Sequence, residues 1–334
     1  MAEMTIPDAA ADTQVPTPPT RDLKVIIQIP CYNEETSLPI SLAELPRTVH
    51  GANVEWLVID DGSEDDTVRV AREHGVDHIV TGGRNRGLAW AFLAGLDKCL
   101  ELGADVIVNT DADNQYCADD IPKLLEPILA GEAEIVIGER PIEQIEHFSP
   151  LKKLLQRLGS WVVRKASGTD VRDAPSGFRA MTRDAAEQLY VFNDYTYTLE
   201  TIIQAGQRNI PVTSVPIRTN PDLRPSRLVR SIRSYVTRSM GTILRIATIY
   251  RPLRSFFVAG SIPLALGLGL CFRWLVLHFS EPDRVRAPSL ILASILILVG
   301  VQLMSLGVVA DLISANRRLL EDLRIRQRRS DSRR

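Results

Sequence analysis

The sequence predicts an α/β protein with a mostly parallel sheet covered by helices on both faces, followed by two helices that cross a membrane. Between Lys24 and about Ile137, short apolar runs alternate with stretches of helical periodicity. This alternation is typical of successive β-α-β units, in which neighbouring strands are parallel. Two apolar stretches near the C-terminus have roughly 23 residues each, which is about 34 Å of helix and enough to span a bilayer.

Five apolar runs are expected to form the strands of the sheet. They cover residues 25–29, 54–59, 78–80, 106–108 and 134–137. Right-handed crossovers place the carboxyl ends of such strands at one edge of the sheet, where open α/β sheets bind their ligands. The second and the fourth run are each followed by an acidic pair, Asp60 with Asp61 and Asp111 with Asp113. We therefore expect a functional site at this edge.

The 334 residues are enough for one large domain and smaller additions. Residues 1–20 are rich in Ala, Thr and Pro and lack both the basic start and the apolar core of a signal peptide, so we expect them to be disordered. The expected parts of the chain are a disordered segment (1–20), an α/β domain (21–222), basic juxtamembrane amphipathic helices (223–255), two transmembrane helices (256–279 and 287–312) and a basic tail (313–334).

We interpret the two apolar stretches as transmembrane helices, with a buried helical hairpin as the alternative. Arginines are concentrated before the first stretch and after the second, whereas the short connector holds Arg284 and Arg286. Because loops rich in Lys and Arg stay on the cytoplasmic side, the α/β domain and both termini are predicted to be cytoplasmic. The expected location is the cytoplasmic (inner) membrane, with a multi-pass topology.

A basic segment connects the α/β domain to the first span. No acidic residue occurs from Leu223 to Arg254, and arginines recur there between apolar residues at helical spacing. Since the net charge of the whole chain is only −2, this segregation of charge indicates contact with membrane lipids rather than with a nucleic acid. A solvated basic helix is the alternative. In the first span, Gly267 and Gly269 would allow close helix packing, which leaves self-association of the chain open.

Asp111 and Asp113 are the most informative residues of the sequence, because they come directly after the buried run 104–110. Two carboxylates at the end of a buried strand repel each other and lose hydration unless a cation compensates them. Oxygen ligands favour Mg²⁺ or Mn²⁺, which often carry a phosphate-bearing substrate. The alternative is an Asp-rich turn that caps the next helix.

Three further motifs lie at the ends of predicted elements. They are Pro30-Cys-Tyr-Asn-Glu34, Asp60-Asp-Gly-Ser-Glu-Asp-Asp-Thr67 and Arg84-Asn-Arg-Gly-Leu-Ala-Trp90. Each alone fits ordinary turn and cap chemistry. In this order, and together with Asp111-Ala-Asp-Asn-Gln115, they resemble the family 2 glycosyltransferases, whose catalytic domain has the GT-A fold. The resemblance covers about Lys24 to Thr219.

The resemblance implies a site for a nucleotide-sugar donor and a divalent metal. The donor would be bound by residues of four loops: Pro30, Tyr32, Asn33, Glu34, Asp61, Arg86, Gly87 and Asp111. The metal, Mg²⁺ or Mn²⁺, would be held on the diphosphate by Asp111, Asp113 and Gln115 and would neutralise the charge of the departing nucleoside diphosphate. For Arg86, a phosphate contact and a plain surface position are both open.

Two later motifs make the chain similar to polyprenyl-phosphate hexosyltransferases, such as dolichol-phosphate mannose synthases. They are Gly138-Glu-Arg-Pro141 and Asp173-Ala-Pro-Ser-Gly-Phe-Arg179. In these enzymes the acceptor is a lipid phosphate monoester. The resemblance assigns this phosphate to Arg140 and Arg179, assisted by Ser176 and Lys153, and makes Asp113, Arg140 and Arg179 the catalytic residues. Structural salt bridges are the alternative for the two arginines.

None of the five histidines lies in these motifs. A phosphate acceptor explains this, because its second pKa of about 6 leaves it mostly a dianionic nucleophile near pH 7. The family implies an in-line attack with inversion at the anomeric carbon, giving a polyprenyl-phosphate sugar for cell-envelope glycan assembly. The donor stays open between UDP-glucose, a UDP-N-acetylhexosamine and GDP-mannose. A membrane glycolipid as acceptor, or a non-catalytic membrane scaffold with the same fold, is the alternative.

Overall fold

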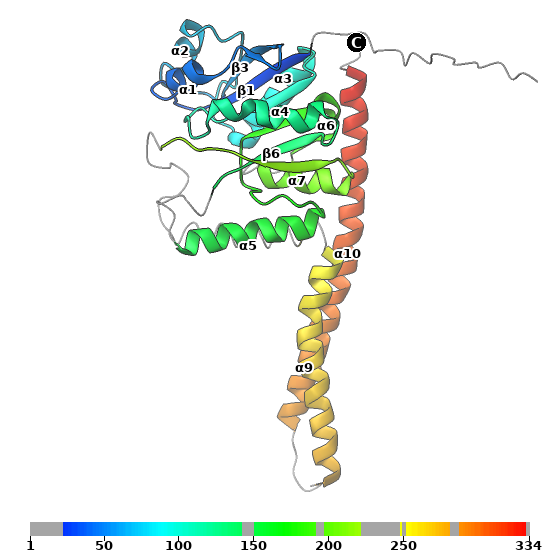
Figure 1. Ribbon diagram of the computed structural model, residues 1–334. Helices are drawn as coiled ribbons and strands as arrows, with labels where there is room; N and C mark the ends of the chain where they lie inside the picture. Colours follow the sequence, from blue (N-terminus) through cyan, green and yellow to red (C-terminus); the bar gives the residue numbers. More distant parts are fainter. Residues whose placement is uncertain are drawn as a thin grey trace, which may run out of the picture.

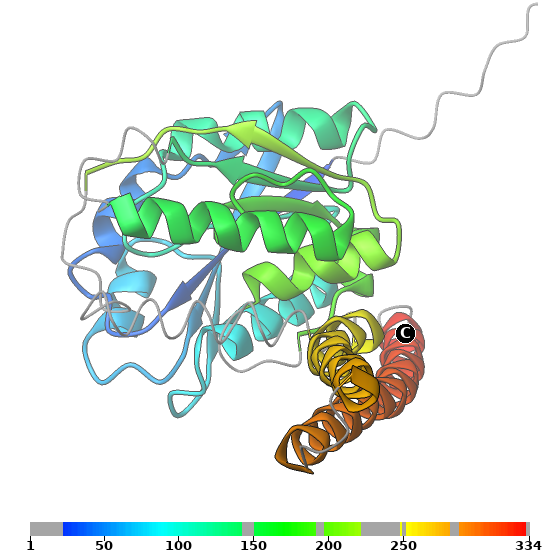
Figure 2. The same ribbon diagram turned by 90° about the horizontal axis from the view of Figure 1, so that it is seen from below.

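The computed structural model describes residues 23–141, 150–191, 197–221, 248, 252–280 and 287–331. The predicted N-terminal segment 1–20 and most of the predicted juxtamembrane segment 223–255 lie outside the described residues. The described chain forms an α/β domain and a long helical hairpin that extends from one side of it (Figure 1). Seen from below, the hairpin stands beside the sheet and not under it (Figure 2).

The centre of the domain is an eight-stranded sheet. Its strands are β1 (Lys24–Cys31), β2 (Thr48–Val49), β3 (Ala52–Asp60), β4 (His78–Thr81), β5 (Val106–Asn109), β6 (Ile135–Glu139), β7 (Arg179–Thr182) and β8 (Val212–Pro216). They lie in the order β2-β3-β1-β5-β7-β6-β8, and β4 also pairs with β3. All pairs are parallel except β2 with β3 and β7 with its two neighbours. The predicted mostly parallel sheet and its five predicted strands are confirmed.

Strands β2, β7 and β8 have no counterpart among the predicted strands. β7 is inserted between β5 and β6, so that Arg179 pairs with Asn109 on one side and with Ile137 on the other. Its sequence, Arg-Ala-Met-Thr, contains no apolar run. The strand conformation of β7 therefore depends on its pairing with both neighbours, and no local sequence pattern predicts it.

Helices cover both faces of the sheet, as predicted (Figure 1). They are α1 (Leu38–Glu44), α2 (Thr67–Glu73), α3 (Leu88–Glu101), the short 3₁₀ turn η1 (Ala118–Asp120), α4 (Ile121–Leu129), α5 (Pro150–Ser167), α6 (Arg183–Gln188) and α7 (Thr198–Gln207). Val25, Ile27 and Ile29 of β1 pack with α1, α2 and α4, whereas Ile26 packs with α3, α6 and α7. Burial on both faces explains why the strand sequences are continuously apolar.

The hairpin consists of α9 (Pro252–Ser280) and α10 (Ala287–Asp331). The segments 252–280 and 287–316 are candidate membrane spans with mean hydropathies of 1.9 and 2.4. Only 11% and 17% of their most apolar windows are buried inside the protein, whereas a core hairpin of a soluble protein would be mostly covered. This argues against the buried-hairpin alternative. α10 continues without a break past the predicted end of the second span at residue 312.

Glycines bring α9 and α10 into close contact. A Cβ on Gly260 would lie 2.7 Å from the carbonyl oxygen of Gly300, and a Cβ on Gly300 would lie 2.8 Å from that of Gly260. Gly267 is similarly close to the carbonyl oxygen of Ala293, at 2.9 Å, whereas Gly269 faces open space. Of the two glycines singled out in the sequence, Gly267 thus packs within the hairpin. Beyond the start of α9, α10 runs along the domain and contacts α6 (Figure 1).

Candidate active site

The two aspartates Asp111 and Asp113 lie in the loop that follows β5, and both are half-buried. The loop turns at Asn114, which has a positive φ of 57°, a conformation that Asn tolerates better than most residues. The backbone N–H of Gln115 donates to Asp113 Oδ1 at 3.3 Å. The next helical turn, η1, starts only at Ala118 and has Cys117 as its N-cap. Helix capping, the alternative role of the aspartates, is therefore not what the structure shows.

The electrostatics of this loop favour a bound cation. Burial, and then the charge of Asp113, raise the pKa of Asp111 to about 7, against the opposing effect of Arg140 and Arg179. Within the described residues, no three Asp, Glu, His or Cys side chains converge on one point. Asp111, Asp113 and Gln115 thus offer an incomplete set of oxygen donors, which fits Mg²⁺ or Mn²⁺ whose shell is completed by phosphate oxygens and water.

This raised pKa predicts that Asp111→Asn stabilises the metal-free protein. An acid whose folded-state pKa lies above its unfolded value of about 3.9 contributes stability below that value and loses it as the pH rises through about 7. In EDTA, we expect the variant to gain on the order of 1–3 kcal/mol at pH 8 and little at pH 4. Thermal unfolding in detergent measures this, with Asp119→Asn as control because the Asp119 side chain is 80% exposed. An equal gain at both pH values would contradict the prediction.

A buried polar network forms the floor beneath the aspartates. The Asn109 amide donates to the carbonyl oxygen of Gly177 at 2.8 Å and to the hydroxyl of Tyr197 at 3.0 Å. It also accepts from Gln28 Nε2 at 2.8 Å, while the N–H of Gly177 donates to the Tyr116 hydroxyl at 3.0 Å. A Cβ on Gly177 would lie 3.0 Å from Asp111 Oδ2, so the glycine lets this loop approach the carboxylate. In the sequence, this network is indicated by Gln28 and Asn109, which are polar residues within otherwise apolar strands.

Arg140 follows β6 and is held by a buried carboxylate. Its Nε and Nη2 donate to the two oxygens of Asp173 at 2.7 and 3.0 Å, and its backbone N–H donates to Asp173 Oδ2 at 3.3 Å. The Asp173 side chain is fully buried, whereas 15% of the Arg140 side chain is exposed. The salt bridge proposed as an alternative thus exists, and Arg140 still acts electrostatically on Asp111. Asp173, in the same motif as Arg179, is the partner that the sequence interpretation missed.

Arg179 and Ser176 are both fully buried. The Arg179 guanidinium donates to the hydroxyl of Thr201 at 2.7 Å and to the carbonyl oxygens of Thr198 and Ser176, and burial lowers its pKa. The predicted direct contact of these two residues with an acceptor phosphate does not fit positions that solvent cannot reach. Lys153 belongs to α5, but its side chain lies outside the described residues.

The loops after β1 and β3 are locked together by their own polar groups. Asn33 donates its N–H to Ser63 Oγ at 2.9 Å and accepts from the N–H of Glu64 at 2.8 Å. The N–H of Glu34 donates to the Thr67 hydroxyl at 2.8 Å. Pro30 is buried in β1, Glu34 is nearly buried, and Tyr32 is 36% exposed at the mouth of this region. The arrangement holds the predicted nucleotide loop in one shape.

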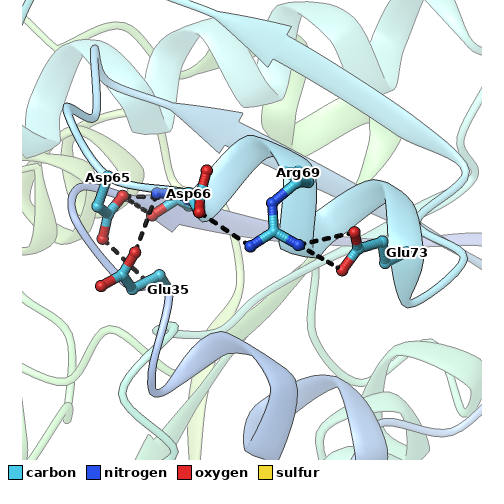
Figure 3. A network of polar contacts seen from close by, with 6 residues as sticks. Glu35, Asp65, Asp66, Arg69 and Glu73 are labelled. Carbon is cyan, nitrogen blue, oxygen red and sulfur yellow. Dashed lines mark hydrogen bonds and ion pairs between the residues drawn. The ribbon is translucent and has the colours of Figure 1, made fainter.

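A second layer of contacts extends this lock toward the surface (Figure 3). Asp65 accepts from the N–H of Glu35 at 3.1 Å, and Glu35 accepts from the N–H of Asp66 at 3.0 Å. Arg69 on α2 then bridges Asp66 and Glu73 at 2.9 and 2.8 Å. The outer carboxylates of the Asp-rich motif therefore stabilise the loops and α2 and do not belong to the metal site.

Asp61 connects the loop after β3 to the start of α3. Its two carboxylate oxygens accept from the backbone N–H groups of Arg86 and Gly87 at 2.8 and 2.7 Å. Asp61 is 3% exposed, and burial raises its pKa in spite of these hydrogen bonds. The Arg86 side chain is exposed, with its guanidinium carbon 4.8 Å from the centroid of the Trp90 ring. The predicted nucleotide residues Asp61, Arg86 and Gly87 thus form one connected unit.

Gly62 makes this unit compact. It has a φ of +75°, and a Cβ there would lie 2.5 Å from the backbone carbon of Arg84. We expect Gly62→Ala to destabilise the protein by about 2–4 kcal/mol, since it adds a backbone clash to an unfavourable φ. Gly83→Ala is the matched control, because Gly83 has a φ of +68° but open space around it, and should cost about 1 kcal/mol. Denaturant unfolding compares them, and equal losses would show that the contact with Arg84 is unimportant.

The sheet brings the predicted site residues to one edge. In the register of the sheet, Cys31 pairs with Asp60 and Gln28 pairs with Asn109, so the loops after β1, β3 and β5 are neighbours. Arg140 reaches the same edge from the end of β6. Within the described residues, the sheet therefore brings the metal loop, the nucleotide loops and Arg140 together at one edge.

A segment that the prediction did not include runs along the metal loop. Thr219 forms an isolated antiparallel bridge with Tyr116, and the N–H of Asn220 donates to the Gln115 carbonyl oxygen at 2.9 Å. Arg218 anchors this segment through a two-pronged contact with the buried Asp120, at 2.8 and 3.1 Å. Residues 218–220 therefore run beside the metal loop.

Comparisons with known proteins agree with this site. Residues 26–190 match the model of "Glycosyl transferase family 2". The chain is 31% identical over 221 residues to a UDP-N-acetylglucosamine–dolichyl-phosphate N-acetylglucosaminyltransferase of Methanococcus voltae, covering 59% of this chain and 86% of that protein. It is 30% identical over 206 residues to an undecaprenyl-phosphate mannosyltransferase of Micrococcus luteus, covering 58% and 83%.

A solved structure supports the fold. Glucosyl-3-phosphoglycerate synthase of Mycobacterium tuberculosis, crystallised with Mn²⁺, UDP and glucosyl-3-phosphoglycerate, superimposes with a TM-score of 0.54 at 20% identity, covering 68% of this chain and 79% of that one. At this identity the likeness concerns the fold alone, which is the GT-A fold. From the family match, the relatives and the fold together, the chain belongs to the family 2 glycosyltransferases and is related to those that act on polyprenyl phosphates.

Proposed function

We propose that this protein transfers a hexosyl group from a nucleoside diphosphate sugar to a polyprenyl phosphate at a membrane surface. One observation carries the proposal: a pair of half-buried carboxylates, Asp111 and Asp113, lies within the electrostatic reach of Arg140, which a buried carboxylate holds in place. A cation site thus adjoins an anion site. This is what a reaction between two phosphate-bearing substrates requires.

The donor is assigned to the loops after β1 and β3 and to the start of α3. Tyr32, which is 36% exposed, is assigned to the base or ribose of the nucleotide, with Pro30, Asn33 and Glu34 shaping the pocket. Asp61 keeps the N–H groups of residues 86 and 87 in position, and Arg86 is close enough to the helix start to contact phosphate. The donors named for the relatives differ, so the sugar stays open between UDP- and GDP-linked hexoses.

Asp111, Asp113 and Gln115 would hold Mg²⁺ or Mn²⁺, which when bound would supply charge neutralisation for the departing diphosphate. The protein holds these donors with the loop turn at Asn114 and with the Asn109–Tyr197 floor beneath them. Removal of the metal by EDTA is expected to stop transfer.

The acceptor phosphate is assigned to Arg140, with Lys153 as a second candidate. A cavity of about 420 Å³ adjoins Arg140 and is lined in addition by Arg172, Thr213 and Ser214. The carboxylates of Glu139 and Asp170 also line it, so the phosphate is assigned to its guanidinium and hydroxyl groups. Arg179 and Ser176 are now given a supporting role behind this surface, since both are buried. The two relatives described above carry a dolichyl or undecaprenyl phosphate in their names, which supports a lipid phosphate as the acceptor.

The reaction needs no protein base. An oxygen of the phosphate monoester dianion forms the new bond to the anomeric carbon while the bond from that carbon to the nucleoside diphosphate breaks on the opposite side. The electron pair of the broken bond leaves with the diphosphate, and the configuration is inverted. The chain's own part is to position both phosphates, with Arg140 on one and the residues 86–87 on the other, and to stabilise the charge that develops.

The hairpin is proposed to anchor the domain to the cytoplasmic face of the inner membrane. α9 and α10 are long and apolar enough to span a bilayer. α5 lies on the side of the domain from which the hairpin extends, and its Trp161 is 53% exposed, as suits a residue in the headgroup layer (Figure 1). A lipid acceptor would then reach the site without leaving the membrane.

The test is a transfer assay with purified full-length protein in detergent. Radiolabelled UDP- and GDP-sugars are offered with undecaprenyl phosphate and Mn²⁺ or Mg²⁺, with EDTA as control. Metal-dependent formation of an organic-phase product that mild acid cleaves would support the proposal and name the sugar. Transfer to an added glycolipid instead would favour that alternative acceptor. Metal-dependent donor binding without any transfer would leave a scaffold as the better account.

A further inference from the structure

α10 carries an exposed apolar stripe that runs past the end of the candidate span. Gly307 packs against Phe256, whose Cβ would lie 2.8 Å from a Cβ on Gly307, so α10 passes the beginning of α9 near this residue. The part of α10 that follows, from residue 308 to Asp331, is about 36 Å long and runs beside the domain (Figure 1). Leu312 and Ile313, at the end of the candidate span 287–316, and Leu319, Leu320 and Leu323, beyond it, are each 60–64% exposed. The domain does not cover these side chains, and Leu319, Leu320 and Leu323 also lie past the end of the candidate span.

The stripe has the spacing of a helix–helix seam. Val309, Leu312, Asn316, Leu319 and Leu323 are separated by 3, 4, 3 and 4 residues, which is the a/d pattern of a coiled coil. Asn316 occupies the central a position, where an Asn favours pairing with an identical Asn on a parallel partner. At 100° per residue, Asn316 points about 180° away from Gly307, which packs on α9. Ser314, seven residues from Gly307 and therefore on the same side of the helix, is only half-exposed.

We propose that this stripe pairs α10 with α10 of a second copy of the chain in a parallel, in-register coiled coil. The inference rests on the membrane placement proposed above and not on the reaction. Copies anchored in one membrane share one orientation, so their α10 helices emerge parallel and at the same height. Asn316 then faces Asn316. Two heptads are too short to associate strongly by themselves, but confinement in the membrane raises the effective concentration of the helices.

Disulfide cross-linking in membranes tests the seam. Starting from full-length protein with Cys117→Ser and Cys271→Ser, we expect Asn316→Cys and Leu312→Cys to form dimers on mild oxidation, about tenfold more than the control Ser314→Cys on the other side of the helix. Equal cross-linking at all three positions, or none at the first two, would overturn the proposal. Cross-linking to a different protein would also overturn it, because the stripe would then serve another partner.

A second variant separates an effect on the seam from an effect on folding. Leu319→Glu with Leu323→Glu places charges in the seam of both copies and should reduce the cross-linking of Leu312→Cys about tenfold. Transfer activity in detergent, which needs only one catalytic domain, should stay within about twofold of the parent, because these positions are far from the metal loop. Unchanged cross-linking would contradict the seam. If the parent shows no transfer at all while cross-linking occurs, the proposed reaction fails and the pairing stands.

Discussion

Asp113→Asn is expected to lower the turnover of hexosyl transfer by about 10³-fold or more, with the protein still folded. Asp113 is half-buried in the loop after β5, and its charge acts on Asp111. The amide keeps the shape of the side chain but removes the negative charge that a divalent cation needs. Transfer at saturating donor and acceptor measures turnover, and the Mn²⁺ affinity, followed by electron paramagnetic resonance, should fall in parallel.

The matched control is Asp119→Asn. Asp119 lies six residues further along, on η1, with a side chain that is 80% exposed and directed to Arg218 at 3.8 Å. Asp119→Asn removes one negative charge, as Asp113→Asn does, but at a position outside the metal loop. Turnover should therefore change less than about threefold. Near-normal turnover of Asp113→Asn, with unaltered Mn²⁺ affinity, would remove the basis of the metal assignment.

Arg140→Ala is expected to reduce kcat/KM for the lipid phosphate by about 10²–10³-fold, because a charge-assisted fork to phosphate is lost. Binding of the nucleotide-sugar, measured by calorimetry without acceptor, should change far less. The variant also leaves Asp173 buried without its partner, which costs about 3–5 kcal/mol of stability. A structural effect must therefore be separated from an effect on the acceptor.

The double variant Arg140→Ala with Asp173→Ala makes this separation. Removing both charges avoids the unpaired buried carboxylate, so most of the lost stability should return. Use of the lipid phosphate should stay impaired if Arg140 contacts it. Recovery of normal acceptor use in the double variant would mean that Arg140 matters only for folding, and loss of donor binding with intact acceptor use would reverse the proposed roles.

The parts of the fold that could be predicted are those with a local signal. β1, β3 and β5 are apolar because both faces of the sheet are covered, and the acidic pairs at their ends are visible as breaks in that pattern. β7 and β8 have no such signal. They form because the edges of β5 and β6 are available, which is a property of the assembled sheet and not of the residues 179–182 or 212–216 themselves.

The difference between local signals and contacts made in the assembled sheet also explains which site residues lie where they were predicted. Asp111, Asp113 and Arg140 follow predicted strands, and the sheet brings them together at its carboxyl edge. Arg179 comes from an unpredicted strand, so nothing in the sequence indicated that its side chain lies inside the domain with Thr201. Asp173 was visible in the motif, but its pairing with Arg140 depends on a contact between positions 33 residues apart. A motif thus identifies the residues of a site better than it identifies which of them are buried.

Because α10 is one unbroken helix, the proposed membrane anchoring would make the position of the domain depend on bilayer thickness. One helix of 45 residues contains the second candidate span and also contacts α6 of the domain, with no hinge between the two regions. A hydrophobic stretch that is longer than the local hydrocarbon responds by tilting. Because α9 packs closely on α10 at Gly260 and Gly300, we expect the anchored pair to tilt together and the domain to lean with it. With the anchoring proposed above, we expect the height of the metal loop above the lipid to vary with acyl-chain length.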